Sequence, residues 1–345
     1  MKALLLSEYR KLEIAELSTP VPDIGEVLVC VAACGICGSD VHGYDGSSGR
    51  RIPPIVMGHE AAGIVVSVGA GVANCSPGDR VTFDSTISCG ECGPCRRGDI
   101  NLCDRRQVLG VSCSEYRRNG AFAEYVTVPS RIVYRLPDSL SFPEAAMLEA
   151  VSVALHAVSL AEIVSDYTAL VVGAGMIGLL SLQALRAVGC SRVLVADLDP
   201  SRLKLAEQLG AAEVLNAGDP DLMQQILQVS GGRGVDIAIE AVGKPETWHW
   251  AVDMVRRGGT VNFFGGCPNE SRVSLDTSLL HYSEITCKAS FHHTPAHIRK
   301  ALDIVGNGDI SAKDFVNRQE PLTNLLEVMR HLMSHNGHLK TAIIP

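Results

Sequence analysis

The sequence predicts an α/β protein made of two parts, a strand-rich, barrel-like domain and a domain with a doubly wound parallel sheet. At 345 residues the chain is too long for one ordinary core and long enough for two domains. Roughly the first 150 residues combine short β-type runs with Gly- and Pro-rich turns. From Thr168 to about Cys287, strands and helices alternate. The change from short strands with turns to alternating strands and helices therefore indicates two domains of different architecture.

The first part contains several short strand candidates that follow turns. Residues 27–31 follow a turn at 23–25, and residues 80–83 follow a turn at 77–79. Many short strands separated by such turns are typical of a compact all-β or barrel-like unit. Further strands are expected at residues 61–68 and 123–128.

The second part alternates buried strands with helices that end at glycine, the pattern of a doubly wound sheet. The expected strands are 169–172, 192–196, 236–240 and 260–264, and the expected helices are 178–188 and 201–209. Ser141 is a suitable cap for a helix over 143–160. A tail with helices at 295–306 and 322–334 and a strand at 340–344 is expected to return to the first domain. We therefore place one domain at 1–148 and 286–345, and the other at 149–285.

Composition excludes several classes of protein. A formal charge of −8 argues against a nucleic-acid partner, which needs a basic surface. No apolar run reaches the ~18 residues that would span a bilayer, and the first residues turn polar too soon for a secretory signal. We therefore expect a cytoplasmic protein without a membrane partner. In a reducing compartment, its 12 cysteines favour metal ligation over disulfides.

A G-x-G-x-x-G motif stands between an expected strand and an expected helix, as in dinucleotide-binding domains. Gly173 permits the tight turn, Gly175 lets the backbone approach a pyrophosphate, and Gly178 lets the helix pack on the strand. Met176 and Ile177 complete the motif at the start of the helix, whose free N–H groups attract phosphates. The alternative is an ordinary glycine-rich turn.

Asp197 ends the next expected strand, 19 residues beyond Gly178. A carboxylate there can accept hydrogen bonds from the ribose hydroxyls and would repel a 2′-phosphate, which favours NAD over NADP. Arg202 is a further candidate cofactor contact, but no basic residue directly follows Asp197. The remaining expected cofactor contacts are Val242, Phe264 and Gly265.

Four cysteines crowd into one short Gly-rich segment, about residues 86–106. The spacing C-x2-C-x2-C-x7-C can satisfy tetrahedral Zn²⁺ completely, and a closed site of this kind has a structural role. A redox C-x-x-C and a nucleic-acid zinc ribbon are the alternatives, but four thiols in one lobe of an acidic protein fit a metal clip better. The predicted structural-zinc ligands are Cys89, Cys92, Cys95 and Cys103.

A second set of metal-binding residue types is spread along the chain. Cys37 stands in C-G-I-C-G-S-D-V-H, His59 and Glu60 stand in G-H-E, and Glu149 begins E-A-V-S-V-A-L-H. Taken singly, each is more often a packing or surface residue than a ligand. Together with the four-cysteine lobe, the G-A-F-A-E-Y stretch at 120–125 and the glycine motif, all in one order, they resemble the zinc-containing medium-chain dehydrogenases. The resemblance covers essentially the whole chain.

The resemblance implies a GroES-like β domain that carries two zinc ions and a Rossmann domain that binds NAD. It implies that Cys37 and His59 bind a catalytic zinc, with Glu149 where the alcohol-dehydrogenase branch has cysteine. Glu60 is the fourth candidate, either as a direct zinc ligand or as a group that contacts the ligands. Ser39 and His42 match the family's proton relay, which leads from the substrate hydroxyl to solvent. Their alternatives are a plain turn residue and a surface histidine.

Glu149 is similar to the sorbitol and threonine dehydrogenase branches, so we predict that a polyol or other secondary alcohol is oxidised to a ketone. The segment after His42 lacks the longer His- and Trp-containing motif of the threonine branch. His292 and His293 stand where sorbitol dehydrogenases have an Arg-Tyr pair. They are candidate contacts for substrate hydroxyls, or for a phosphate if protonated, and packing residues are the alternative.

Other substrates and one other class stay open at this point. Threonine, butanediol-type diols and sugar-alcohol phosphates are the alternative substrates. A non-catalytic nucleotide-binding protein is the rival class, although it would be expected to have lost Cys37, His59 or Glu149. By resemblance we also expect a homodimer or homotetramer.

The role assigned to Asp197 predicts a cofactor preference. The ratio kcat/KM should be higher with NAD than with NADP, because the carboxylate binds ribose hydroxyls and repels the 2′-phosphate. Steady-state kinetics with both dinucleotides tests this, and a higher efficiency with NADP would reverse the assignment.

Overall fold

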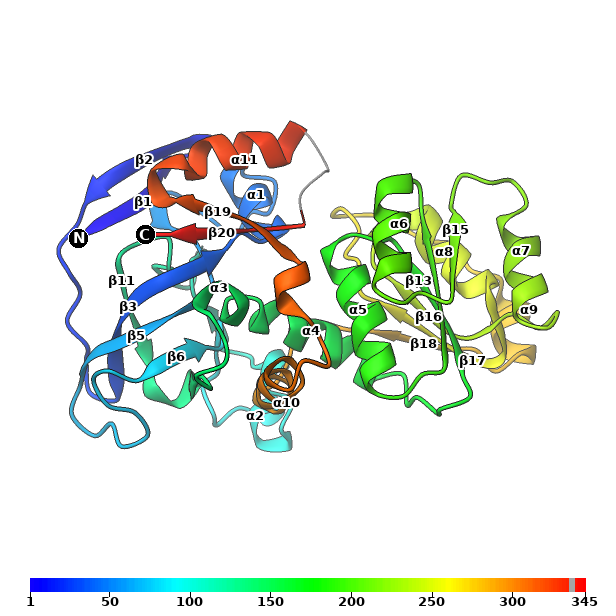
Figure 1. Ribbon diagram of the computed structural model, residues 1–345, viewed down its shortest axis with the longest axis horizontal. Helices are drawn as coiled ribbons and strands as arrows, with labels where there is room; N and C mark the ends of the chain where they lie inside the picture. Colours follow the sequence, from blue (N-terminus) through cyan, green and yellow to red (C-terminus); the bar gives the residue numbers. More distant parts are fainter. Residues whose placement is uncertain (335–338) are drawn as a thin grey trace. The chain divides into compact units, whose positions relative to one another are not determined.

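The chain folds into two compact units, as seen in a computed structural model that describes residues 1–334 and 339–345 (Figure 1). The first unit comprises Met1–Glu149 with Thr294–Pro345, and the second comprises Ala150–His293. The sequence places the second boundary after residue 285, eight residues earlier. The contacts move it because β18 (Thr286–Ala289) pairs in parallel with β17 (Val255–Phe263) of the second unit. Residues 335–338 of the expected first domain lie outside the described part.

A seven-stranded sheet forms the centre of the first unit. Its strand β3 (Glu26–Gly35) pairs antiparallel with β5 (Glu60–Val68), β11 (Tyr125–Pro129) and β20 (Lys340–Ile344). The strand order is β12-β6-β5-β3-β20-β19, with β11 added beside β3. The other strands of this sheet are β6 (Arg80–Phe83), β12 (Val133–Arg135) and β19 (Val316–Pro321).

Smaller sheets complete the β-rich unit around one core, in which Leu6, Phe83 and Phe122 are fully buried. One sheet has the order β2-β1-β4, and two further antiparallel sheets pair β7 with β8 and β9 with β10. Their bounds are β1 (Lys2–Glu8), β2 (Lys11–Glu16), β4 (Ile55–Val56), β7 (Thr86–Ile87), β8 (Gln107–Val108), β9 (Val111–Ser112) and β10 (Arg117–Arg118). The prediction of a strand-rich, barrel-like domain is confirmed.

Short helices surround these sheets. The α-helices of the first unit are α1 (Gly38–Tyr44), α2 (Gly93–Arg97), α3 (Phe142–Ala145), α10 (Pro295–Gly306) and α11 (Leu325–Ser334). The 3-10 turns are η1 (Ile100–Leu102), η2 (Ser130–Ile132), η3 (Ala312–Asp314) and η4 (Leu322–Asn324). No helix in the described part of the chain is long and apolar enough to cross a membrane.

The helix predicted over 143–160 is two helices, α3 and α4 (Leu148–Ser159). Ser141 caps α3 as expected, since its Oγ accepts a hydrogen bond from the Glu144 backbone N–H at 3.4 Å. The prediction of one continuous helix was wrong because neither Gly nor Pro marks the break at Ala146–Met147, and apolar residues continue through it.

A six-stranded parallel sheet with the order β15-β14-β13-β16-β17-β18 forms the second unit, so the doubly wound sheet is confirmed. The chain builds outward from β13 in one direction and then, from β16, in the other. Ligands bind α/β sheets at the carboxyl ends of strands beside such a reversal. The further elements are β13 (Thr168–Val172), β14 (Arg192–Asp197), β15 (Glu213–Asn216), β16 (Val235–Glu240), α5 (Met176–Ala187), α6 (Pro200–Gln208), α7 (Leu222–Val229), α8 (Pro245–Asp253) and α9 (Thr277–Tyr282).

Candidate metal centres and dinucleotide site

The four cysteines of the lobe at 86–106 converge on one point. Their Sγ atoms lie within 4.8 Å of one another, with 3.9 Å between Cys89 and Cys95 and 3.8 Å between Cys92 and Cys103. Zinc–sulfur bonds of about 2.3 Å in a tetrahedron place neighbouring sulfur atoms about 3.8 Å apart. None of the four forms a disulfide. The sulfur positions therefore fit a zinc ion with four thiolate ligands.

Local backbone geometry brings these thiols together. Cys92 is the N-cap of α2, and Gly98 ends that helix with φ +92°. A hydrogen bond from the Glu91 backbone N–H lowers the pKa of Cys89 to about 6, against the effect of desolvation. Desolvation, with a hydrogen bond to Cys92, raises the pKa of Cys95 to about 12. One thiol of the cluster is thus already prepared to ionise and bind a cation.

A second cluster lies where two strands of the central sheet meet. The ligand atoms of Cys37, His59 and Glu60 lie within 4.8 Å of one another. Cys37 is the N-cap of α1, directly after β3, and His59 and Glu60 stand at the start of β5. Since Gly35 of β3 pairs with Glu60 of β5, the antiparallel register brings the three donors together.

The donor types of this cluster fit a zinc ion. Zinc in proteins takes Cys sulfur, His nitrogen and carboxylate oxygen, and three protein ligands leave one position open. His59 and Glu60 are buried and Cys37 is partly exposed, so solvent or a substrate can reach only one side. The mixed set and the partial exposure fit a reactive zinc rather than a closed structural one.

A buried lysine stands behind Glu60. Lys340, the first residue of β20, lies with its Nζ 2.5 Å from Glu60 Oε2 and 3.0 Å from the Ile36 carbonyl oxygen. Burial alone would lower the pKa of Lys340, but the negative charges of Glu60 and Cys37 outweigh it and raise the pKa. The lysine therefore stays charged, and a metal ion bound by Glu60 would compete with the ammonium group for its carboxylate.

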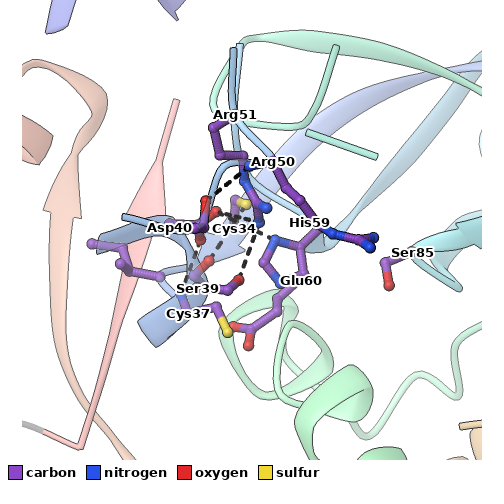
Figure 2. Close-up of polar contacts among 12 residues, drawn as sticks. Cys34, Cys37, Ser39, Asp40, Arg50, Arg51, His59, Glu60 and Ser85 are labelled. Atoms are coloured by element: carbon purple, nitrogen blue, oxygen red, sulfur yellow. Dashed lines mark hydrogen bonds and ion pairs between the residues drawn. The ribbon is translucent and has the colours of Figure 1, made fainter. Parts of the chain in front are cut away.

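A buried carboxylate orients His59 from the other side (Figure 2). Asp40 is 0% exposed, and its Oδ1 lies 3.4 Å from His59 Nδ1. Burial opposes protonation of His59, but the charge of Asp40 and a hydrogen bond to it raise the pKa of His59 well above its usual value. With Nδ1 held beside Asp40, a metal ion that binds Nε2 would displace only the proton on Nε2, the arrangement that commonly orients ligating histidines.

Arg51 connects Ser39 to this carboxylate. Its guanidinium lies 3.6 Å from Asp40 Oδ1 and donates a hydrogen bond of 3.1 Å to Ser39 Oγ (Figure 2). Arg51 is 5% exposed, so this contact is well shielded from water. A guanidinium can only donate, so Ser39 must accept, and its own hydrogen is directed elsewhere. Arg51 was not identified from the sequence, where it stands only as one of two adjacent arginines.

Glu149 does not belong to the cluster of Cys37, His59 and Glu60 as described. It lies at the start of α4, is buried, and accepts a hydrogen bond of 3.1 Å from Ser85 Oγ. Ser85, which the sequence analysis missed, therefore positions this carboxylate. His42 lies exposed on α1 with its Nδ1 3.2 Å from Ser47 Oγ.

The two histidines expected near the substrate lie in the second unit. His293 is buried, and His292 is partly exposed with φ +54° and its ring edge-on to Phe291 at 4.5 Å. Burial, followed by the charge of His293, lowers the pKa of His156 in the same unit. The role of both residues toward a substrate stays a prediction.

The glycine motif forms the turn between β13 and α5 that the sequence predicts. Gly173 has φ +98°, and Gly175 is the N-cap of α5, with Met176 and Ile177 in the first turn. A Cβ on Gly178 would overlap the Gly173 carbonyl oxygen, which explains why glycine is needed there. The open N-terminus of α5 fits the pyrophosphate of a dinucleotide.

Asp197 ends β14 beside this turn. Its Oδ2 accepts from the Ala174 N–H at 2.6 Å and its Oδ1 from the Asp199 N–H at 2.9 Å. A carboxylate has about four lone-pair positions, so both oxygens keep capacity for ribose hydroxyls. Arg202 points instead to Asp199, with 3.7 Å between Nε and Oδ2.

Glu240, which the sequence analysis also missed, organises the other expected cofactor contacts. It is 0% exposed, and its Oε1 accepts from the backbone N–H groups of Val242 at 2.9 Å and Gly243 at 2.8 Å. Its backbone carbonyl accepts from the N–H groups of Phe264 and Gly265, both at 2.9 Å. The loops after β16 and β17 are thereby held together at the carboxyl ends of the strands.

Comparison with known proteins gives matches over both units. Residues 23–138 match the model of the alcohol dehydrogenase GroES-like domain, and residues 177–307 match that of the zinc-binding dehydrogenases. A sorbitol dehydrogenase of Bacillus subtilis is 34% identical over 100% of this chain and 97% of its own length. A probable D-xylulose reductase A of Arthroderma otae is 32% identical over 98% and 96%. A solved zinc-binding dehydrogenase from Sinorhizobium meliloti 1021 bound to NADP superposes with a TM-score of 0.93 at 33% identity, over 100% of this chain and 99% of that one.

The buried pair of Arg51 and Asp40 predicts a large loss of stability when the guanidinium is removed. Arg51→Met should lower the free energy of unfolding by about 3 kcal/mol, because removing one partner leaves an incompletely compensated buried charge. Urea denaturation of the zinc-loaded protein measures it. The exposed pair of Arg135 with Asp79 supplies the control: Arg135→Met should cost no more than about 1 kcal/mol. Equal losses in the two variants would contradict the role of Arg51.

Proposed function

Because the chain belongs to the zinc-binding dehydrogenases with a GroES-like alcohol dehydrogenase domain, we propose that it oxidises a secondary hydroxyl of a polyol to a ketone and passes the hydride to NAD. Alcohol dehydrogenase activity and the cofactors zinc and NAD(P) follow from that membership. The observation that carries the proposal is the convergence of Cys37, His59 and Glu60 on one partly exposed point.

The proposed ligands of the catalytic zinc are Cys37, His59 and Glu60, with Glu149 as the alternative carboxylate. A zinc ion bound there would act as a Lewis acid: such an ion can lower the pKa of bound water to about 7 and would affect an alcohol similarly. Lys340 donates a hydrogen bond to Glu60, and Ser85 donates one to Glu149. Each carboxylate therefore keeps a hydrogen-bond partner whichever of the two binds the zinc ion. Cys89, Cys92, Cys95 and Cys103 are the proposed ligands of the structural zinc.

Ser39 and His42 are proposed to move the proton that the alcohol loses. Ser39 accepts from Arg51, so its hydroxyl hydrogen is available to pass along a relay while Oγ takes up the next proton. His42, three residues further on α1, is exposed and can release a proton to water. The buried Asp40 keeps the guanidinium in place and so supports the direction of transfer.

The dinucleotide is proposed to bind the turn after β13, with Gly173, Gly175 and Gly178 next to the pyrophosphate and Asp197 on the ribose. NAD is preferred in this proposal because both oxygens of Asp197 accept hydrogen bonds and Arg202 is directed to Asp199. A cytoplasmic homodimer or homotetramer completes the proposal, which rests here on the resemblance to the family.

A substrate panel tests the activity. The zinc-loaded protein with NAD should form NADH with a polyol, whereas Cys37→Ser should reduce the rate by at least about 100-fold through loss of a zinc ligand. Absorbance of the reduced cofactor is the measurement. Oxidation of threonine or of a simple diol alone would move the substrate outside the polyols. If no alcohol led to NADH formation although two zinc ions and NAD were shown to be bound, the proposed function would be contradicted.

A further inference from the structure

A cavity of about 840 Å³ in the first unit is rich in arginine. Its walls come from the loop at residues 49–52, the segment at 102–107 and the loop at 113–116. Three guanidinium groups line it, those of Arg50, Arg105 and Arg106. A concentration of positive charge is unexpected in a chain with a formal charge of −8.

Asp104 and Glu115 are the carboxylates that line this cavity, and neither forms a close ion pair with Arg50. Arg105 is paired with Glu91, which lies outside the cavity lining. Hydrogen bonds from Cys113 and Ser114 lower the pKa of Glu115, and the positive charge of Arg50 lowers it further, while Asp104 is exposed. In the described part of the chain, no carboxylate forms an ion pair with Arg50 within 4.0 Å.

Arg50 and Arg106 both line the cavity, and their charges interact. Arg106 is half-buried and donates to the Asn101 carbonyl oxygen at 2.7 Å. Burial lowers the pKa of Arg106, and the positive charge of Arg50 lowers it further. Two guanidinium groups that share a partly buried space repel each other, and an anion between them would relieve this repulsion.

Tyr116 adds a neutral donor to the two cations. Its hydroxyl oxygen accepts from the Val108 N–H at 3.0 Å, so the hydroxyl hydrogen stays available to a ligand. Burial raises the pKa of Tyr116, and the phenol therefore remains protonated. Two guanidinium groups and a hydroxyl are the donors that phosphate oxygens attract.

Residues next to the cavity lining in the chain are hydrogen-bonded to residues of the candidate zinc site. Arg51, the neighbour of Arg50, is bonded to Ser39, and the Leu109 N–H donates at 3.0 Å to the carbonyl oxygen of Ser85, which bonds Glu149. Figure 2 shows that the two arginines diverge. Arg51 turns toward Asp40, whereas the Arg50 side chain extends past His59 toward Ser85.

We propose that this cavity is an anion subsite, in which Arg50, Arg106 and Tyr116 bind the phosphate of a polyol phosphate monoester whose hydroxyl is oxidised at the zinc site. This inference rests on the proposed function and narrows its substrate class. Arg50 is the specificity-determining residue in this proposal, because it lines the cavity and directly precedes Arg51, which bonds Ser39.

Kinetics with matched substrates tests the subsite. For the wild-type enzyme, kcat/KM should be higher for a polyol phosphate than for the same polyol without phosphate. Arg50→Gln should reduce this ratio by about 10- to 100-fold, the effect of one charged hydrogen-bond partner. Arg50→Lys should restore part of the ratio. The control Arg135→Gln, on an exposed arginine outside the cavity, should leave the ratio unchanged.

Calorimetry with inorganic phosphate separates this inference from the proposed function, because it needs no turnover. The zinc-loaded wild type should bind phosphate, and Arg50→Gln should bind it at least about tenfold more weakly. Equal efficiency with both alcohols overturns the subsite while the dehydrogenase activity stands. Phosphate binding that depends on Arg50, without preference for the phosphorylated alcohol, also overturns it and indicates an effector site. Absence of oxidation of every alcohol contradicts the proposed function instead.

Discussion

The antiparallel pairing of β3 with β5 and β20 is the constraint on which the candidate zinc site depends. It sets Cys37 after the end of one strand, His59 and Glu60 at the start of the next, and Lys340 at the start of a strand from the far end of the chain. A shift of register by one residue would turn every side chain of a strand to the other face. The central sheet thus fixes the ligand geometry, and the buried charges of Asp40 and Arg51 fix the orientation of the groups around it.

The two candidate metal centres differ in their donor atoms and in the parts of the chain that supply them. The four thiols at 86–106 come from one lobe, and their spacing leaves no position for a further ligand. The other centre collects a thiol, an imidazole and a carboxylate from separate elements, and each is held by a neighbour: His59 by Asp40, Glu60 by Lys340. Such supporting contacts set the orientation and basicity of metal ligands. The first centre fits a structural zinc and the second fits a zinc that takes part in reaction.

The features that the sequence predicted correctly are those that depend on a few neighbouring residues. The glycine turn after β13, the cap at Ser141 and the four-cysteine lobe each depend on a few adjacent residues, and the structure has all three. The break between α3 and α4 was missed because no residue type marks it. Ser85 was missed because its partner is distant in the sequence: it bonds Glu149, 64 residues away. Arg51 and Glu240 were missed because no motif marks their contacts, which Arg51 makes with Ser39 and Glu240 makes with the turn that follows it. Only the folded chain shows that these polar groups face buried partners, so no periodicity or motif could have identified them.

The central claim is that Cys37, His59 and Glu60 bind a zinc ion distinct from that of the four-cysteine lobe. Zinc content per chain, measured by elemental analysis on folded protein after dialysis, tests it most directly. The wild type should hold two zinc ions, Cys37→Ser should hold one, and the control Cys30→Ser, a cysteine of β3 outside both clusters, should hold two. One zinc ion in the wild type, or two retained in Cys37→Ser, would contradict the claim.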